Sequence, residues 1–237
     1  MRNNMNINKA CRYYLFRDKE TILNIIVCMI IVLGFSFLLC KNVFESKSTS
    51  YVLLMLYVLI VGLTQITANS MIINLTVKDK LNKRIEFIIA SGINIKNIIR
   101  AYTIEMWRIS SILPFFLFFF TYYLYDFKKD FKWIVGIYIS TVIMLYFEIL
   151  FLNIFSLSRK NFKFFKNLVF FGTTLFIYIV GSFSNKILSL LDKYDINLIY
   201  LIVGINIILL LTFGIFSIIN LARINNESII NKEGTWS

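Results

Sequence analysis

Six long apolar runs, separated by short polar segments, constrain this chain more than any other feature of its sequence. The first covers residues 22–40 and contains no charged residue; the others cover residues 51–75, 109–125, 133–155, 167–183 and 198–221. A helix rises about 1.5 Å per residue, so roughly 17 to 25 apolar residues cross the hydrocarbon layer. We therefore predict an all-α, polytopic membrane protein with six transmembrane helices, in which residues 1–237 form a single domain.

The composition agrees with this class and argues against several kinds of active site. Hydrophobic residues make up 58% of the chain, and it contains one proline and no histidine. Without histidine, a zinc site of the HExxH type and a histidine-dependent catalytic triad are excluded. No GxxxxGK[ST] loop is present to hold a nucleotide. We expect that the chain is not itself an enzyme and binds no cofactor or metal.

The distribution of basic residues predicts the orientation. Eighteen of the 25 Lys and Arg residues fall in the two terminal segments and in the segments after the second and fourth spans. Cytoplasmic loops carry the excess of Lys and Arg, so we expect both termini in the cytoplasm. The net charge of +12 is then explained by contact with anionic lipid, and nucleic acid is not expected as a partner.

The two ends of the chain are expected to lie on the cytoplasmic side. Residues 1–21 form a basic, amphipathic pattern, with Cys11 and Leu15 on one side of a helical projection and Lys9 and Arg12 opposite. This pattern is typical of a helix that lies in the membrane interface. Residues 222–237 are expected to be a cytoplasmic tail.

A polar, charged region of residues 78–100, which we call the coupling segment, separates the second and third spans. Leu81, Ile85, Ile88 and Ile89 recur at helical spacing, which predicts a short amphipathic helix. Gly92 follows this run as a helix-ending glycine, and Asn94 is placed to cap the next helix. The pattern predicts a helix, a glycine corner and a second helix that continues into the third span.

Residues 83–93, with the sequence KRIEFIIASGI, resemble the cytoplasmic coupling region of ABC-2-type transporter permeases. The likeness extends to the N-terminal amphipathic helix, the six spans and the cytoplasmic ends. The chain differs at Arg84 and Ile85, where many relatives have Gly-Thr, and at Gly92, where many have proline. The resemblance implies a permease that pairs with a second copy or a paralogue and with two separate ABC ATPase subunits, which would bind ATP and Mg.

We further expect the ATPase to contact residues of the coupling segment. These are Leu81, Arg84, Ile85, Glu86, Phe87, Ile88, Ile89, Ser91 and Gly92. We expect the apolar members to fill a groove on the ATPase, and Arg84 and Glu86 to fix the orientation through charge pairs. The alternative is a surface helix that only lipid stabilises.

Charges within the spans are costly in hydrocarbon and usually face a protein interior. Glu105 and Arg108 stand three residues apart, so we expect them to pair on one face of the third helix. Glu148 lies at a similar depth in the fourth span. We predict an interhelical contact between Arg108 and Glu148, with a structural role favoured over substrate binding.

The second and third spans carry further signals. Gln65 and Asn69 are four residues apart and share a helix face, where they either line a polar translocation path or join helices through hydrogen bonds. Pro114 removes one backbone hydrogen bond and is expected to kink the third span.

Two functions remain open at this stage. The first is the permease subunit of an ATP-driven exporter for an amphipathic or antimicrobial peptide or another amphiphile; its short outer loops provide no extracellular receptor domain. The second is a non-transporting membrane anchor or regulator that holds a soluble partner. The abundance of Lys, Asn, Ile and Phe indicates an AT-rich bacterial genome, so we expect the protein in a bacterial plasma membrane.

Overall fold

The computed structural model describes residues 2–41, 44, 47–125, 131–158 and 162–230, and every regular element in these ranges is a helix. The elements are α1 (Arg2–Arg17), α2 (Lys19–Cys40), α3 (Thr49–Met71), a π-helical segment η1 (Ile72–Val77), α4 (Lys78–Leu81), α5 (Arg84–Ala90), α6 (Ile95–Ser110), α7 (Ile112–Leu124), α8 (Phe131–Ser158), α9 (Phe162–Lys193), α10 (Leu198–Arg223) and α11 (Asn226–Ile230). The all-α prediction is confirmed for these residues.

Polar residues at the boundaries of the apolar runs start several helices. The Asp18 carboxylate accepts from the Thr21 backbone N–H at 2.8 Å at the start of α2, and Asn94 and Asn197 accept in the same way at the starts of α6 and α10. Such side chains satisfy N–H groups that have no partner within the helix. Asn94 therefore caps the helix for which the sequence predicted it.

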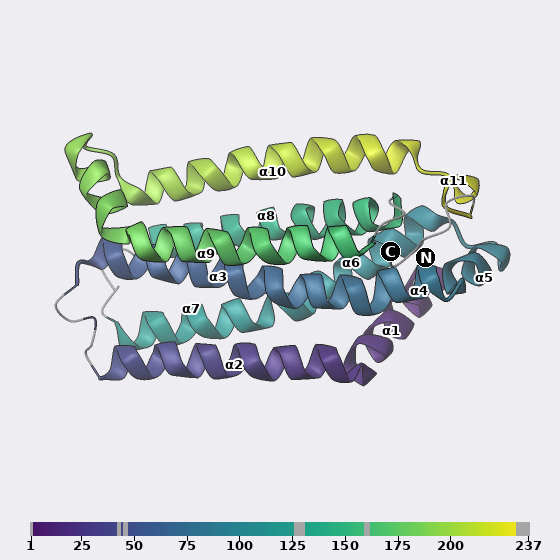
Figure 1. Cartoon of the computed structure of the whole chain (residues 1–237), viewed down its shortest axis with the longest axis horizontal. Coiled ribbons are helices and arrows are strands. Elements are labelled where there is room, and N and C mark those ends of the chain that lie inside the picture. Colours follow the sequence, from purple (N-terminus) through teal and green to yellow (C-terminus); the bar gives the residue numbers. More distant parts are fainter. Residues whose placement is uncertain (1, 42–43, 45–46, 126–130, 159–161, 231–237) are drawn as a thin grey trace.

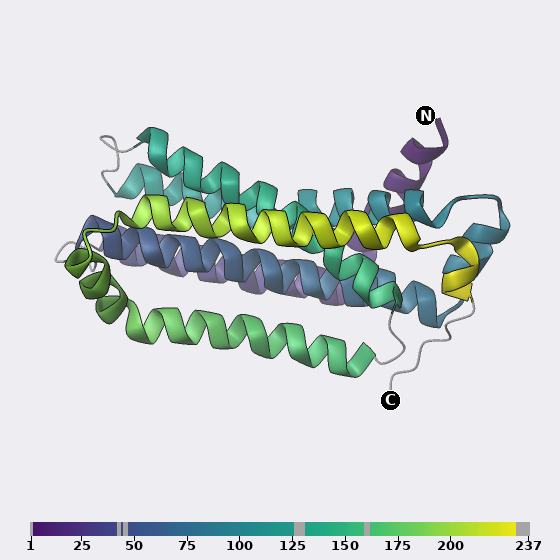
Figure 2. The ribbon, with the colours of Figure 1, turned by 90° about the horizontal axis from the view of Figure 1, so that it is seen from above.

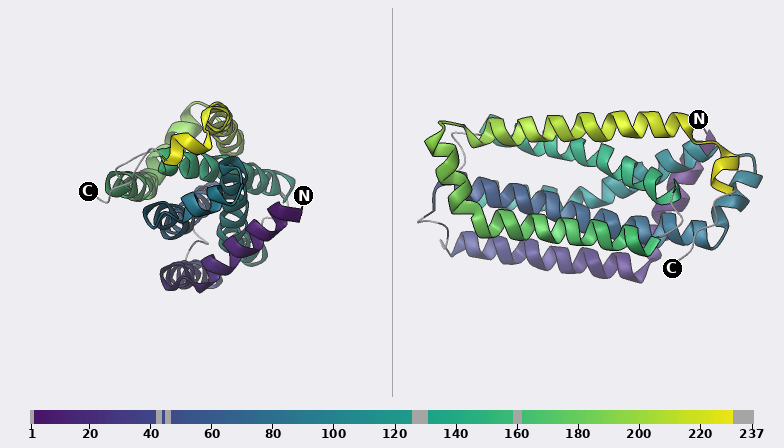
Figure 3. Two further views of the ribbon diagram at one scale, coloured as in Figure 1. Left: turned by 90° about the vertical axis from the view of Figure 1, so that its right-hand side faces the viewer. Right: turned by 45° about the horizontal axis from the view of Figure 1, so that its top comes forward.

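Six helical stretches are long and apolar enough to cross a membrane. They are Lys19–Cys40, Thr49–Leu81, Ile95–Leu124, Ile134–Ser158, Thr174–Lys193 and Leu198–Arg223. The long helices run side by side as a bundle, and α1, α4, α5 and α11 gather at one end (Figure 1). The end-on view shows α1 crossing that end obliquely (Figure 3). This arrangement is that of a multi-pass membrane protein.

The second span is at the centre of the bundle and the fifth is at its edge. In the most apolar window of Thr49–Leu81, 72% of residues are buried, against 11% for Thr174–Lys193. Helix α9 lies apart from most of the bundle and packs mainly on α3 (Figure 2). At their contact Gly62 leaves room for Ile177, because a Cβ atom at Gly62 would lie 2.6 Å from Ile177 Cδ1.

The buried apolar side chains form two clusters along the bundle. One joins α2, α3, α7, α8 and α10, and its fully buried members include Val32, Ile60 and Leu117. The other, which we call the second core cluster, lies toward the coupling segment and joins α1, α3, η1, α5, α6 and α8 around Met71, Ile98 and Met106. Helix α1 and the coupling segment therefore share one core with the ends of the spans that adjoin them.

Two of the spans are not uniform α-helices. The second changes to a π-helix over Ile72–Val77 before it returns to α-helix in α4. The third is interrupted at Ser111, between α6 and α7. Pro114 lacks the N–H that the Ser110 carbonyl would accept in a continuous helix, and the break lies next to this carbonyl; the kink expected at Pro114 stays a prediction.

The observed bounds correct several predicted ones. The second span extends beyond residue 75 to Leu81, and the helix that contains the fifth span ends at Lys193, ten residues later than predicted. The N-terminal helix ends at Arg17, because Asp18 starts a new helix. The tail contains the short helix α11, and residues 231–237 lie outside the described residues.

Candidate functional site

The coupling segment forms the expected helix, corner and helix. Lys83 has a left-handed backbone (φ 57°) between α4 and α5, and Gly92 has φ 86° between α5 and α6. Glycine adopts this conformation without a Cβ clash, which explains why the corner falls at Gly92. The Gly92 N–H donates to the Ile89 carbonyl oxygen at 2.9 Å and closes the end of α5.

The apolar face of α5 points into this chain and not outward, which corrects part of the prediction. Ile85 is 1% exposed and Ile89 8% exposed, and both belong to the core cluster around Met106. They are therefore not available to fill a groove on another protein. Phe87 is 75% exposed and is the outward apolar side chain of α5. Leu81, Glu86 and Ile88 are partly exposed, and Ser91 and Gly92 are exposed.

Arg84 contacts its own chain, and its expected charge pair with a partner stays a prediction. Its Nη1 lies 3.4 Å from Asp79 Oδ1, and its guanidinium lies 5.3 Å from the centre of the Tyr14 ring. Asp79 is 5% exposed and also accepts from the Tyr102 hydroxyl at 2.7 Å. These contacts fasten α4, α5, α6 and α1 to one another.

Helix α1 is held to α6 by a charge pair that the sequence analysis missed. Arg12 donates from Nε to Glu105 Oε2 at 2.7 Å and from Nη2 to Oε1 at 3.1 Å. The hydrogen bonds to Glu105 raise the pKa of the Arg12 guanidinium. Next to this pair Cys11 is 2% exposed, and its burial raises the pKa of the thiol. Arg12 appeared to belong to a solvated face because the position of α6 is not visible in a helical projection of α1.

The predicted pair of Glu105 and Arg108 is confirmed, but the predicted contact between Arg108 and Glu148 is wrong. Arg108 Nη1 donates to Glu105 Oε1 at 3.2 Å, whereas Glu148 Oε1 accepts from Gln65 Nε2 at 2.6 Å. Trp107 faces α8, because its Nε1 donates to a carbonyl of that helix. Arg108 lies about 100° further around the helix, and its side chain is 56% exposed and bound to Glu105.

Polar side chains join the spans inside the bundle, and we call this set the polar seam. Its members are Tyr57, Gln65, Thr76, Thr103, Thr141, Glu148, Asn153 and Asn206. Asn206 on α10 is the centre of one group in the polar seam. The Tyr57 hydroxyl donates to Asn206 Oδ1 at 2.9 Å, and Asn206 Nδ2 donates to Thr141 Oγ1 at 2.9 Å. These bonds connect α3, α8 and α10.

Asn153 is the centre of a second group in the polar seam. It is fully buried, its Oδ1 accepts from Thr76 Oγ1 at 2.6 Å, and its Nδ2 donates to Thr103 Oγ1 at 3.2 Å. One side chain thus joins α8 to η1 and to α6. The sequence alone did not single it out, because an asparagine in an apolar run does not show which helices surround it.

Gln65 and Asn69 share a helix face as predicted, but they have different surroundings. Gln65 joins α3 to α8 through Glu148. Asn69 is 7% exposed, and its Oδ1 is among the described buried atoms without a hydrogen-bond partner, together with Glu148 Oε2. The contact of Gln65 is a direct link between helices; whether this face also lines a translocation path stays a prediction.

The C-terminal helix α11 is a further part of the site that the sequence analysis did not find. Asn226 Oδ1 accepts from the Ile95 backbone N–H at 3.0 Å, and Lys96 Nζ donates to the Ala222 carbonyl oxygen at 3.2 Å. Ile229 is 4% exposed and lies in the second core cluster. Both ends of the described chain therefore pack on the coupling segment.

The described residues contain no group of three or more His, Cys, Asp or Glu side chains that could hold a metal ion. Comparisons of the chain with family models, curated proteins and solved structures give no match. The likeness to ABC-2-type permeases therefore depends on the residues and topology of the chain itself.

Proposed function

We propose that this chain is the permease subunit of an ATP-driven exporter and that the coupling segment receives movement from a separate ATPase. The observation that carries the proposal is the direct connection of this segment to two spans. Thr49–Leu81 leads into it and Ile95–Leu124 leads out of it. Each of these stretches is on the order of 45 Å long at 1.5 Å per residue. A displacement of α5 is thereby passed to the whole depth of the membrane.

The contacts that hold the coupling segment to the neighbouring helices support this role. The Asp79 contacts, the Arg12–Glu105 pair and the bonds of α11 hold α5 and its neighbours as one unit. A rigid segment of this kind moves as one body and passes a displacement to the spans, whereas a flexible loop would change its own conformation instead. In this proposal Phe87 is the principal apolar contact with the ATPase, with Glu86 and Ile88 beside it.

The rest of the proposed complex follows from the resemblance. Two ABC ATPase subunits, which bind ATP and Mg, act on two permeases, each a copy or a paralogue of the other. Both termini lie in the cytoplasm of a bacterium, and α1 lies at the inner membrane interface. The cargo is an amphipathic or antimicrobial peptide or another amphiphile taken from the cytoplasm or the inner leaflet, because the outer loops are short.

Co-purification from the native host with a tagged chain tests the proposal. We expect an ATPase with a P-loop to be recovered in stoichiometric amount and its recovery to fall in Phe87→Ala. Burial of a phenylalanine contributes about 1.5–3 kcal/mol, so the affinity should fall about tenfold or more. Tyr194→Ala is the matched control, because Tyr194 is a 65% exposed aromatic residue far from the coupling segment.

Each outcome decides between the two functions. Loss of the ATPase in Phe87→Ala but not in Tyr194→Ala supports the exporter. Recovery of a stable partner that does not bind nucleotide supports an anchor or regulator, because the same helix would then hold a different protein. Full retention of the ATPase in Phe87→Ala refutes the role of α5 in coupling.

A further inference from the structure

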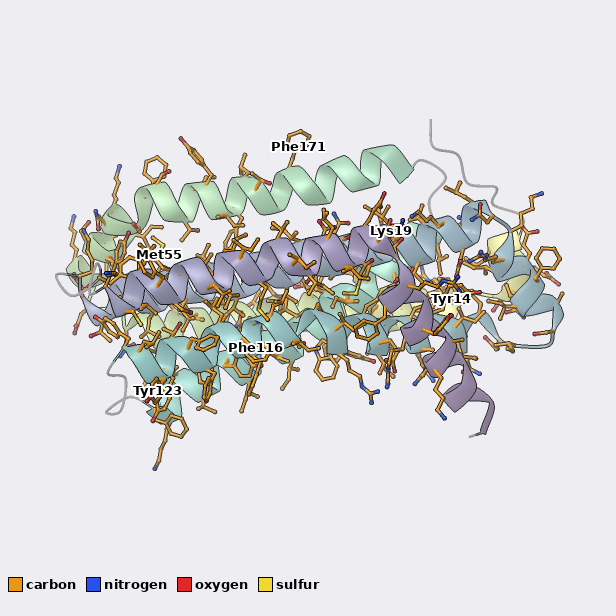
Figure 4. The ribbon with its side chains drawn as sticks, turned by 90° about the horizontal axis from the view of Figure 1, so that it is seen from below. Tyr14, Lys19, Met55, Phe116, Tyr123 and Phe171 are labelled. Atoms are coloured by element: carbon orange, nitrogen blue, oxygen red, sulfur yellow. The ribbon has the colours of Figure 1, made fainter. Side chains whose placement is uncertain are left out.

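A cavity of about 640 Å³ lies between α1, α5 and α6. Its volume is within the range of roughly 300–1,000 Å³ that is common for ligand pockets. A smaller cavity of about 230 Å³ adjoins it along α4, and Tyr14, Leu75, Asp79 and Arg84 line both. Figure 4 shows Tyr14 on α1 near the junction with the coupling segment. The two cavities thus meet at the Arg84 contacts described above.

The larger cavity is mainly apolar. Ile7 and Ala10 contribute from α1, and Phe87, Ile88 and Ile93 contribute from α5 and the corner after it. The polar lining residues include Asp79, Arg84 and Tyr102, which already bond to one another. A hydrocarbon chain is the kind of occupant that such a lining favours.

The smaller cavity has an excess of positive charge, because Arg17, Lys78 and Arg84 line it against Asp18 and Asp79. Lys78 Nζ lies 3.5 Å from Asp18 Oδ1, and Arg84 Nη1 lies 3.4 Å from Asp79 Oδ1. Each carboxylate also accepts a hydrogen bond, Asp18 from Thr21 and Asp79 from Tyr102. The Arg84 guanidinium has five N–H donors, and its side chain is 52% exposed. This arrangement favours a ligand with a negative headgroup.

Helix α1 brings both cavities to a lipid surface, if α1 lies at the membrane interface as the proposed function requires. Its sequence contains four basic residues and no acidic residue. Tyr13 and Phe16 are 60% and 52% exposed, and exposed aromatic rings of this kind suit the headgroup level of a membrane. A basic, aromatic helix is attracted to anionic lipid.

We propose that an anionic phospholipid binds here, with one acyl chain in the larger cavity and its phosphate against Arg84 in the smaller one. The lipid occupies the space between α1 and α5 and so becomes part of the unit that carries the coupling helix. The inner leaflet then contributes a structural component to the coupling segment.

Photo-crosslinking of the full-length chain in lipid nanodiscs tests this site. The nanodiscs consist of phosphatidylcholine with a small fraction of phosphatidylglycerol that carries a diazirine at the end of one acyl chain. We expect labelling of peptides from α1 and α5, and displacement of the label by unlabelled phosphatidylglycerol but not by phosphatidylcholine. The experiment needs no ATPase, so its result is independent of the partner proposed above.

Two pairs of variants locate the acyl chain and the headgroup. Ala10→Trp fills the larger cavity and should lower the labelling about tenfold, whereas Ala90→Trp, at an exposed position on α5 that lines neither cavity, should not. Arg84→Gln should reduce the preference for phosphatidylglycerol about tenfold, and Arg100→Gln, which removes the same charge elsewhere, should leave it unchanged.

Three results would overturn the proposal. One is labelling spread evenly over the lipid-facing helices and unaffected by Ala10→Trp. Another is equal displacement by phosphatidylcholine, which would mean that no anionic headgroup is recognised. The third is labelling that persists when the cavity is filled in a second way by Ile88→Phe, which keeps the test valid if Ala10→Trp does not fold.

Discussion

Replacement of Asn153 by leucine removes three interhelical hydrogen bonds from the centre of the bundle and keeps the branched shape and the number of heavy atoms of the side chain. The bonds to Thr76, Thr103 and the Met106 sulfur join α8 to η1 and to α6. Interhelical hydrogen bonds in membranes contribute on average about 0.6 kcal/mol and at most about 1.7 kcal/mol each. We therefore expect Asn153→Leu to lower the free energy of unfolding by about 1–2 kcal/mol and the Tm by about 2–8 °C.

The cysteines of the chain provide the assay. Cys11 and Cys28 are 2% and 1% exposed, so a thiol-reactive dye reports their exposure when the protein unfolds in detergent. Cys40 is exposed and would react in the folded state, so Cys40→Ser is the background for all measurements. A double-mutant cycle of Asn153→Leu with Thr76→Val then isolates the energy of one bond.

A matched control uses a threonine whose hydroxyl stays within its own helix. Thr212 is exposed and donates to the Ile208 carbonyl oxygen at 2.7 Å, so Thr212→Val should leave the Tm within about 1 °C. The reasoning is refuted if Asn153→Leu has the Tm of the background protein, or if the effects of Asn153→Leu and Thr76→Val simply add.

Three further substitutions test other contacts. Glu148→Gln should raise the Tm by about 2–4 °C, because an uncharged amide replaces a buried carboxylate. Gly62→Leu should lower the Tm and loosen α9, and Ile177→Ala in the same chain should partly restore it. Burial acts to raise the pKa of Asp18, but the hydrogen bonds from Thr21 and the nearby Lys78 ammonium together outweigh it and leave the pKa below its ordinary 3.8. Asp18 therefore stabilises the fold at neutral pH and loses this effect as the pH falls below about 4, and Asp18→Asn should weaken the acid dependence of the Tm.

Each of these expectations has a contrary result. A lower Tm in Glu148→Gln would mean that the negative charge of the carboxylate stabilises the fold. An unchanged Tm in Gly62→Leu would show that Ile177 moves aside at no cost. If Asp18→Asn leaves the acid dependence of the Tm unchanged, other carboxylates cause that dependence.

The sequence was sufficient to predict the parts of the structure that depend on local pattern. The six apolar runs, the corner at Gly92, the cap at Asn94 and the pair of Glu105 with Arg108 all follow from spacing along one chain segment. In each case the partners are close in sequence or the signal is a run of one residue class. Periodicity is sufficient for such features.

The contacts between helices were harder to predict from the sequence, because they depend on how each helix is rotated about its axis. Arg12 and Glu105 are far apart in sequence, and the contact of Arg108 with Glu148 was predicted from depth alone. The buried face of α5 was misjudged for a related reason. Ile85 and Ile89 have the spacing of an apolar stripe, and such a stripe packs equally well on its own chain or on a partner.

The contacts made by the second span depend on the exact number of residues in the π-helical segment η1. Asn74 in this segment donates to Asp18 at the junction of α1 and α2, and Thr76 donates to Asn153 on α8. Loss of one residue from η1 would turn everything beyond it by about 100° relative to the preceding helix, because one α-helical turn has 3.6 residues. Substitutions on the lipid-facing surface of the bundle leave that angle intact. The length of this one stretch therefore determines the relative rotation of the two halves of the span, whereas residue identity on the membrane surface does not.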